Sequence, residues 1–316
     1  METKFLVIKN TYKGGDSFVV DKSDILDAID SYDEITCSVE KENKQLIFMN
    51  DMLKRMADNL CSQNNKHHHD LLLASRVQQQ FLPPNFIEDD SYEIAVYYKP
   101  LNGVSGDFYD YFFTANGKLL GIGLFDVAGH GVASALITMV AKQLLPKTFN
   151  FFNTLGEPLS ETMHAYNLAF QIELNGFDQY MTGALVRFHE NSIEIASAAH
   201  TDPYLKRGME YVEKVNETYG AFKGPIIGIP EMIQKLKYAS KNIPMHSNDT
   251  LLLYTDGLTE SKNENNENYE SYLPCDFLKQ EGSAKDILQH IVTKFNSFMN
   301  KSMVKDDITI MVIRKK

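Results

Sequence analysis

Four acidic sites in this sequence lie at the ends of strand-like apolar runs. Asp126 follows the run GIGLF and precedes a small-residue turn, and Asp256 ends the continuous run LLLYT. Asp107 begins an aromatic run, and Asp306 and Asp307 come directly before the last apolar run. A carboxylate removed from water is costly unless a cation or hydrogen bonds compensate it. Each residue alone could be a turn or a helix cap, but four such sites together favour a shared cluster.

Clustered carboxylates repel one another and need a cation, and the ligand chemistry selects which one. Oxygen-only ligation prefers hard ions, Mg²⁺ or Mn²⁺. No His-x-His or Cys pair accompanies the acids, which argues against zinc. Two hard ions bridged by a carboxylate can bind a phosphate and lower the pKa of a water that attacks phosphorus in line. The chemistry indicated is hydrolysis of a phosphate ester.

The bulk properties exclude several classes of partner. A formal net charge of −11 over 316 residues argues against nucleic acid and against an anionic membrane surface. The longest apolar runs have strand length, and the first 15 residues lack the pattern of a signal peptide. Cys37, Cys61 and Cys275 are widely spaced and form no metal pattern. We therefore expect a cytoplasmic protein with no nucleic-acid or membrane partner.

The chain divides into three parts by its patterning. Residues 1–45 mix short apolar runs with a turn-like KGGD and predict a small N-terminal regulatory element. Residues 46–82 carry a heptad seam from Leu46 to Phe81, which Pro83 and Pro84 end. The seam predicts a parallel two-stranded coiled coil, and hence a homodimer through residues 46–82. The alternative is a long helix that lies on its own domain. Residues 83–316 form the third part.

The third part alternates between blocks of strands and blocks of helices. Such an order suits antiparallel sheets covered by helices, an α+β class, rather than alternating βαβ units. The polar stretch 261–271 predicts a mobile loop. The near-match GHGVAS to a dinucleotide fingerprint is weak in this context. Strands are expected at 92–100, 118–127, 179–188, 191–199, 204–215, 249–255 and 306–314, and helices at 132–145, 159–174 and 283–300.

The order of the sequence blocks resembles a known family. The blocks are GVSGDFYDYF, LFDVAGHGVASALITM, MTGALVRF, ASAAHTDPYL, GPIIGI, LLLYTDGLTES and KDDITIMVIR, preceded by ASRVQQQFLPP. Together they resemble the SpoIIE/RsbU-type branch of the PPM (2C-type) metal-dependent serine/threonine protein phosphatases, over roughly residues 74–316. The resemblance implies an α-β-β-α sandwich of two antiparallel sheets flanked by helices, preceded by the coiled-coil-like helix and the small N-terminal element.

The resemblance also implies a set of metal ligands. Asp126 would bridge two Mn²⁺ or Mg²⁺ ions, and the backbone carbonyl of Val127 would bind one of them. Asp256 and Asp306 would hold the ion that they share with Asp126. Asp107 would hold the second ion, directly or through water. In addition, Asp110 would lie just outside the ligands, and Gly129 and Gly257 would be small to let the backbone and the substrate approach.

The sequence departs from the wider family at the position of the general acid. That family places a His soon after the bridging Asp, but Val127 and Ala128 fill the near positions here. His130 lies further along, and we take it as a candidate catalytic acid that protonates the leaving serine oxygen; capping of the following helix is the alternative. Ala199 and Thr201 also differ from the branch, whereas all four acidic metal positions are intact.

The resulting hypothesis is a metal-dependent protein serine/threonine phosphatase. By resemblance, its substrate would be a phosphorylated regulatory protein of the anti-anti-sigma (STAS) type in a partner-switching pathway. The heptad helix would control how the phosphatase domain presents Asp107 and Asp126. The alternative is a non-catalytic module that binds a phosphorylated regulator. A metal-dependent phosphodiesterase or nuclease is a third hypothesis, against which the acidic surface and the missing basic stripe argue.

Overall fold

The computed structural model describes residues 5–9, 17–129, 131–230 and 237–316. It divides into two compact units, residues 1–69 and residues 70–316. Among the described helices, none has the length and the apolar character that a bilayer crossing requires.

The first unit is a hairpin followed by a long helix. Strands β1 (Phe5–Lys9) and β2 (Ser17–Asp21) pair antiparallel, and α1 (Lys22–Phe81) follows at once. Asp21 caps this helix, because its Oδ1 accepts the backbone N–H of Ser23 at 3.0 Å. Helix α1 therefore begins well before residue 46 and includes much of the segment expected to be a separate element. The β-branched run at 34–39 is helical, since no Pro or Gly interrupts residues 22–81.

The predicted heptad seam is uncovered within the first unit. Leu46, Met49, Leu53, Met56 and Leu60 are each more than half exposed. A row of large apolar side chains on one face of a helix is the surface that a partner helix would cover. The dimer itself stays a prediction.

Two six-stranded sheets form the second unit. The first has the strand order β10-β9-β13-β14-β4-β3, and the second has β11-β8-β7-β6-β5 with β12 also paired to β8. All pairs are antiparallel except β11 with β8. The strands are β3 (Phe86–Glu88), β4 (Tyr92–Lys99), β5 (Asp107–Phe113), β6 (Leu119–Val127), β7 (Met181–Phe188), β8 (Ser192–Ala198), β9 (Tyr204–Arg207), β10 (Tyr211–Lys214), β11 (Lys223–Gly224), β12 (Ser240–Pro244), β13 (Thr250–Tyr254) and β14 (Ile308–Lys315).

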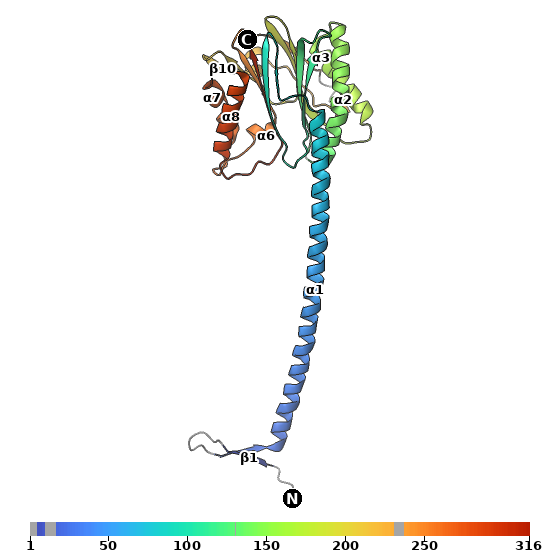
Figure 1. The fold of residues 1–316 in the computed structure, drawn as a ribbon, viewed down its shortest axis with the longest axis vertical. Helices are drawn as coiled ribbons and strands as arrows, with labels where there is room; N and C mark the ends of the chain where they lie inside the picture. The colour runs from blue at the N-terminus through green and yellow to red at the C-terminus, as the bar shows by residue number, and fades with distance from the viewer. Residues whose placement is uncertain (1–4, 10–16, 130, 231–236) are drawn as a thin grey trace. The chain divides into compact units, whose positions relative to one another are not determined.

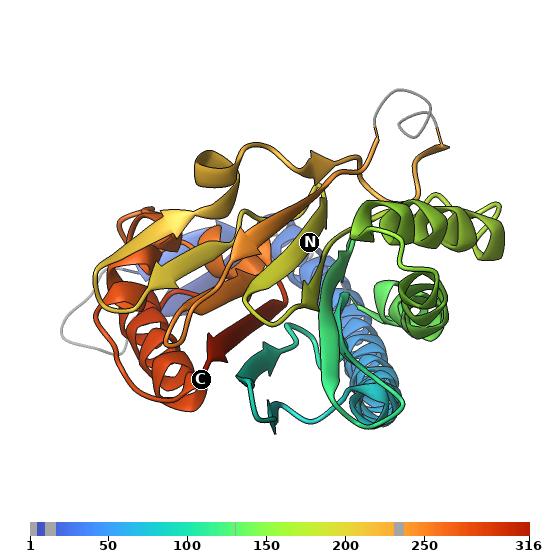
Figure 2. The ribbon, with the colours of Figure 1, turned by 90° about the horizontal axis from the view of Figure 1, so that it is seen from above.

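Helices cover both outer faces of these sheets (Figures 1 and 2). Helices α2 (Val132–Thr154) and α3 (Leu159–Glu173) share an apolar core with the second sheet, and α7 (Leu273–Leu278) and α8 (Ala284–Met299) share one with the first. A third core lies between the two sheets. The predicted α-β-β-α sandwich is confirmed. The short helices are α4 (Val215–Tyr219), α6 (Asp256–Thr259) and the 3-10 helix η1 (Tyr269–Ser271).

Several predicted boundaries differ from the structure for local reasons. Residues 204–215 form the two strands β9 and β10, because the chain turns at Gly208 with φ +51°. Helix α2 continues past residue 145 and contains Pro146. Strand β12 was not expected, since its sequence SKNIP carries little apolar pattern. The expected loop at 261–271 contains a bridge between Lys262 and Asn268. Its last three residues form the 3-10 helix η1, in which Tyr269 is fully buried.

Candidate active site

Strand pairing places the first two predicted acids side by side. In the register of β5 and β6, Asp107 lies directly opposite Asp126, and Thr182 of β7 lies opposite Asp126 on the other side. Directly opposite residues of antiparallel strands share a face. The predicted cluster therefore begins with a row of side chains across three strands of the second sheet.

The other predicted acids come from the first sheet. Asp256 is two residues beyond the end of β13, and Asp306 is two residues before β14, the antiparallel neighbour of β13. Asp126 does not cap helix α2, because the residue at that cap is Gly131 and no side chain bonds there. The strand-end acids thus lie together at one edge of the sandwich, which we call the catalytic edge: Asp107, Asp126, Asp256, Asp306 and Asp307.

Burial and neighbouring carboxylates raise the pKa of Asp126 and of Asp256 at the catalytic edge. Burial first, and then Asp256 and Asp306, raise the pKa of Asp126 to about 8. Burial and the charges of Asp306 and Glu260 raise the pKa of Asp256. Among the described residues, Asp126, Asp256 and Asp306 form no ion pair with a Lys, Arg or His. Negative charge therefore gathers here, and none of these three carboxylates has a described cation within ion-pair distance.

Asp107 lies deeper than the other acids and is held by threonines. Its side chain is fully buried, and its Oδ2 accepts hydrogen bonds from Thr255 Oγ1 at 2.9 Å and from Thr309 Oγ1. Burial and the neighbouring Asp126 raise the pKa of Asp107 well above its usual range. Because Thr255 and Thr309 belong to the first sheet, these bonds join the two sheets at the catalytic edge.

Asp307 has a structural task that its neighbour Asp306 lacks. Its Oδ1 accepts the N–H of Leu101 and its Oδ2 accepts the N–H of Gly106, each at 2.7 Å. The side chain is buried, so both oxygens are satisfied by backbone groups. Asp307 therefore fixes the loop that precedes Asp107.

Asp306 faces the surface instead. Its side chain is exposed, and the one hydrogen bond it receives is from the backbone N–H of Asp307. It lines a cavity of about 450 Å³ together with Gly257, Lys262 and Lys305. Glu260 lines the cavity as well, so its lining offers two lysines to an anionic substrate beside two acids.

Glycines allow close backbone contacts at this edge. A Cβ on Gly106 would lie 2.6 Å from the carbonyl oxygen of Val127, the predicted backbone ligand. A Cβ on Gly257 would lie 2.0 Å from the carbonyl oxygen of Asp307, which explains a small residue there. Gly129 is different: its φ is +87° and nothing crowds it, so the turn conformation requires this glycine.

Two further predicted positions have separate outcomes. Asp110 forms an ion pair with Lys142, with 2.7 Å between Oδ2 and Nζ, so its charge is balanced apart from the cluster. His130 lies outside the described residues.

Another histidine lies beside the row formed by Asp107, Asp126 and Thr182, because His200 Nδ1 is 2.9 Å from the Thr182 hydroxyl. Burial lowers the pKa of His200 to about 3, which keeps its ring neutral.

The donor set of the catalytic edge fits hard divalent cations, Mn²⁺ or Mg²⁺. It consists of carboxylates and a backbone carbonyl, with no sulfur ligand and no described imidazole among them. In the described part of the chain, no group of three or more His, Cys, Asp or Glu side chains converges closely enough to hold an ion as the side chains stand. The acids are thus electrostatic neighbours whose oxygens do not meet at one point, as expected where like charges repel.

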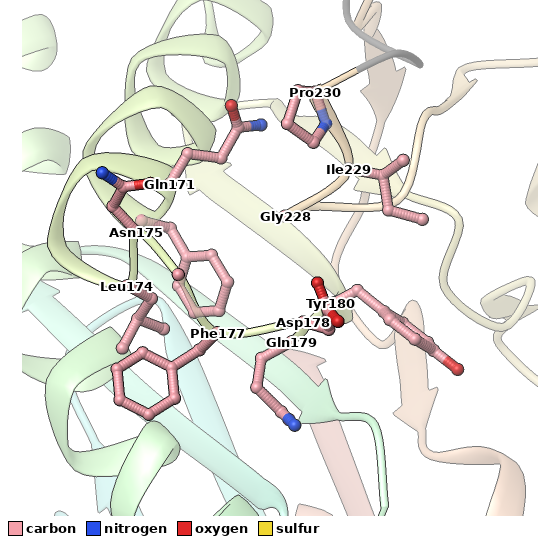
Figure 3. Close-up of a pocket in the computed structure, with 12 residues that line it drawn as sticks. Gln171, Leu174, Asn175, Phe177, Asp178, Gln179, Tyr180, Gly228, Ile229 and Pro230 are labelled. Atoms are coloured by element: carbon pink, nitrogen blue, oxygen red, sulfur yellow. The ribbon is translucent and has the colours of Figure 1, made fainter.

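A second cavity lies beside the start of strand β7. Its volume is about 420 Å³, and in Figure 3 Gln171 of α3 and Leu174, the residue that follows α3, lie on one side and Ile229 and Pro230 on the other. Tyr180 also lines it, and the Tyr180 carbonyl accepts the N–H of Ala128, two residues after Asp126. A backbone hydrogen bond therefore joins the lining of this cavity to the turn that follows Asp126.

Sequence reasoning missed the residues that hold the acids in place. Thr255, Thr309 and Asp307 carried no role in the prediction. A signal for Asp307 is present in the adjacent pair of acids, because successive residues at the start of a strand point to opposite sides and cannot share one task. The threonines next to strand-end acids carry no comparable signal.

The catalytic edge can now be compared with known proteins. The family model for stage II sporulation protein E (SpoIIE) matches residues 116–316, more than half of the chain. The chain belongs to the SpoIIE family. The predicted SpoIIE/RsbU branch of the PPM-type phosphatases is thereby confirmed. Asp126, Val127, Asp256 and Asp306 lie within the matched region of this SpoIIE-family chain, whereas Asp107 lies before it.

Two curated relatives of this SpoIIE-family chain come from Bacillus subtilis (strain 168). Phosphoserine phosphatase RsbU is 24% identical over 260 residues, which cover 77% of this chain and 69% of RsbU. Phosphoserine phosphatase RsbP is 26% identical over 193 residues, which cover 60% of this chain and 45% of RsbP. The chain thus spans less than half the length of RsbP.

Solved structures agree with the SpoIIE-family fold. The SiaA PP2C domain of Pseudomonas aeruginosa has a TM-score of 0.64 and 23% identity, with coverage of 80% of this chain and 98% of that one. The PP2C phosphatase domain of SpoIIE from Bacillus subtilis, solved with a fragment of its regulatory domain, has a TM-score of 0.56 and 19% identity, with coverage of 72% and 64%. At these identities the likeness establishes the fold.

Proposed function

We propose that this chain is a metal-dependent protein serine/threonine phosphatase that hydrolyses a phosphoserine or phosphothreonine on a regulatory protein. The observation that carries the proposal is the catalytic edge, where burial and neighbouring carboxylates raise the pKa of Asp126 and of Asp256, and no described cation forms an ion pair with either. Membership of the SpoIIE family supports the same activity.

In this proposal the chain's own groups have defined tasks. Asp126 would hold both ions and the Val127 carbonyl one of them, Asp256 and Asp306 would hold the ion shared with Asp126, and Asp107 would hold the other, directly or through water. Two Mn²⁺ or Mg²⁺ ions bound there would neutralise the phosphoryl oxygens and lower the pKa of a water that attacks phosphorus. His130 is proposed to protonate the serine oxygen as the phosphorus–oxygen bond breaks.

The proposed substrate is a regulatory phosphoprotein of the anti-anti-sigma (STAS) type. The relatives RsbU and RsbP are both named phosphoserine phosphatases, which supports a phosphoserine substrate. Lys262 and Lys305 line the cavity beside Asp306, where a doubly charged phosphoserine would enter. An acidic chain with no basic stripe does not suit a nucleic acid or an anionic membrane.

Phosphate release tests this proposal. The chain with Mn²⁺ should release phosphate from an aryl phosphate and from a phosphorylated STAS-type protein, and Asp126→Asn should abolish both activities. Asp90→Asn is the matched control, because Asp90 is an exposed acid away from the catalytic edge. Binding of the phosphoprotein without any release by the unmodified chain would instead support the non-catalytic module.

We also propose that the chain is a homodimer through the seam of α1. The exposed apolar side chains from Leu46 to Leu60 support a parallel partner helix. Leu53→Glu puts a charge into the seam and should yield monomers in analytical ultracentrifugation. Asn59→Glu, an exposed position off the seam, is the control and should stay dimeric. A monomeric unmodified chain at micromolar concentration would exclude the dimer.

The end of α1 is proposed to carry control into the catalytic edge. Gln78 is buried, its Nε2 donates to the Ser105 carbonyl at 2.7 Å, and its Oε1 accepts the Ser105 N–H at 3.0 Å. Ser105 Oγ in turn accepts the N–H of Asp107 at 3.0 Å. A shift of this helix end would therefore move the backbone that presents Asp107. Removal of residues 1–73 should change the activity and the oligomeric state; an unchanged, dimeric enzyme would refute this role.

A further inference from the structure

Three polar side chains form a row across the first sheet, at the end away from Asp256. Thr250 begins β13, and the strand register places Lys206 of β9 and Arg314 of β14 directly opposite it on its two sides. Such residues share one face of the sheet. Leu252, two residues along β13 on that same face, packs in the core beneath α7 and α8. The row therefore points into the layer of these helices.

The row lines a cavity of about 360 Å³. Asn248, from the turn before β13, and Glu281, from the loop before α8, also line it. This volume lies in the usual range for small-molecule sites, roughly 300–1,000 Å³. The cavity can thus hold a small ligand but not a folded partner.

Thr250 is the residue that the fold alone does not explain. Its side chain has an exposed fraction of 0%, and its Oγ1 has no hydrogen-bond partner among the described residues. A buried hydroxyl without a partner costs free energy that valine, of nearly the same shape, would avoid. Thr250 is among the residues that line the cavity, and a ligand bound there would supply the missing partner.

The charges beside Thr250 favour an anion. Lys206 is only 2% exposed, and one of its three donors goes to the Gln280 carbonyl. Burial lowers the pKa of Lys206; Glu281 opposes this effect and Arg314 adds to it, so the two cations repel each other. Lys206 is buried and Arg314 is partly buried, and two cations with donors to spare at one cavity are a common arrangement for holding an oxyanion.

Acids balance these cations only partly. Arg314 donates to Asn248 Oδ1 at 2.6 Å and lies 3.6 Å from Glu93 Oε1, beyond a normal charged hydrogen bond. Glu93 is itself engaged, because its Oε2 accepts the N–H of Ala284 at 3.0 Å.

We propose that this cavity binds the phosphate group of a small molecule, held by Lys206, Arg314 and the Thr250 hydroxyl. The site is separate from the catalytic edge, because Asp256 is six residue steps along the chain from Thr250, about 20 Å at ~3.3 Å per residue of extended chain. Its occupant would stabilise the junction of β9, β13 and β14 from the end opposite to the acids. The proposal stands whether or not the chain is a phosphatase.

Inorganic phosphate is the probe that tests this site. The full chain is kept in EDTA, so that no metal recruits phosphate to the catalytic edge, and sodium chloride keeps the ionic strength constant. Millimolar phosphate should raise the midpoint of thermal unfolding and give a saturable signal in titration calorimetry. Thr250→Val should weaken phosphate binding by at least ~10-fold, the loss of one charged hydrogen bond.

The valine variant separates a ligand role from a structural one. Without phosphate, Thr250→Val should unfold at the same or a higher temperature, because the lost hydroxyl has no partner. Arg314→Gln should weaken phosphate binding to a similar extent, and Lys118→Gln, at an exposed lysine elsewhere, should leave it unchanged. An equal phosphate response in the unmodified chain, Thr250→Val and Arg314→Gln would overturn the proposal, as would no response of the unmodified chain.

Discussion

Strand β13 has an aspartate just beyond each of its ends, and the two have opposite surroundings. Asp249, before the strand, is paired with Arg207 and also accepts the N–H of His246 at 2.9 Å. Asp256, after the strand, has Asp306 and Glu260 as its charged neighbours. One end of the strand therefore neutralises its acid within the protein, and the other end surrounds its acid with further carboxylates. The difference teaches that burial of an acid marks a functional site only where its partner is missing.

Substitution of Asp256 should have the largest effect, on activity rather than stability. Asp256→Asn removes a proposed metal ligand, so phosphate release with Mn²⁺ should fall at least ~100-fold. The free energy of unfolding without metal should stay the same or rise, because one of the mutually repelling charges is gone. Activity assays and urea unfolding of the same preparation check both parts. A large loss of stability with little loss of activity would reverse the assignment.

Substitution of Asp249 should have the converse effect. Asp249→Asn leaves the buried Arg207 with only part of its charge balanced, by Glu213 at 3.0 Å. The free energy of unfolding should fall by about 2–3 kcal/mol. The activity of the folded fraction should be nearly unchanged, since this end of β13 is far from the catalytic edge. Equal kcat values for this variant and the unmodified chain would sharpen the contrast between the two ends.

Asp306 and Asp307 show the same contrast between neighbours: protein groups satisfy the carboxylate of Asp307, and that of Asp306 is exposed. Asp307→Asn replaces one acceptor oxygen by an amide group that faces a backbone N–H of the loop 101–106. We expect a loss of about 1–2 kcal/mol in the free energy of unfolding. Asp306→Asn should cost no stability but should lower activity as Asp256→Asn does. If both variants lost stability equally, the division of roles between these neighbours would be wrong.

The smallest expected effect is the change in the free energy of unfolding per pH unit. The folded protein raises the pKa of Asp126 from 3.8 to about 8. Between these two pH values Asp126 is protonated in the folded state and ionised in the unfolded state. The free energy of unfolding without metal should therefore fall as pH rises from about 4 to about 8. The slope from this residue is at most ~1.4 kcal/mol per pH unit. Urea unfolding in EDTA measures it, and Asp126→Asn should flatten it; an unchanged slope would contradict a raised pKa.

The sequence was a good guide to what periodicity and chemistry determine. Apolar alternation predicted the strands of both sheets, and the spacing of acids at strand ends predicted that Asp126, Asp256 and Asp306 come together. Features that depend on tertiary contacts were missed. Strand β12 forms because its backbone adds to β8 and not because of its side-chain pattern. Helix α1 extends back to Lys22, into residues 1–45, which were predicted to form a small separate element. The bonds of Asp307 to residues about 200 positions earlier leave no local trace in the sequence.

Because of these long-range bonds, the catalytic edge can form only after residues 306–315 have been synthesised. Strand β14 lies between β13 and β4, and Asp307 directly precedes it. Until the ribosome has delivered residues 306–315, the first sheet is in two separate pieces and the loop before Asp107 has nothing to hold it. A nascent or prematurely terminated chain would therefore be inactive, so the protein would not dephosphorylate anything before its translation has passed this last strand.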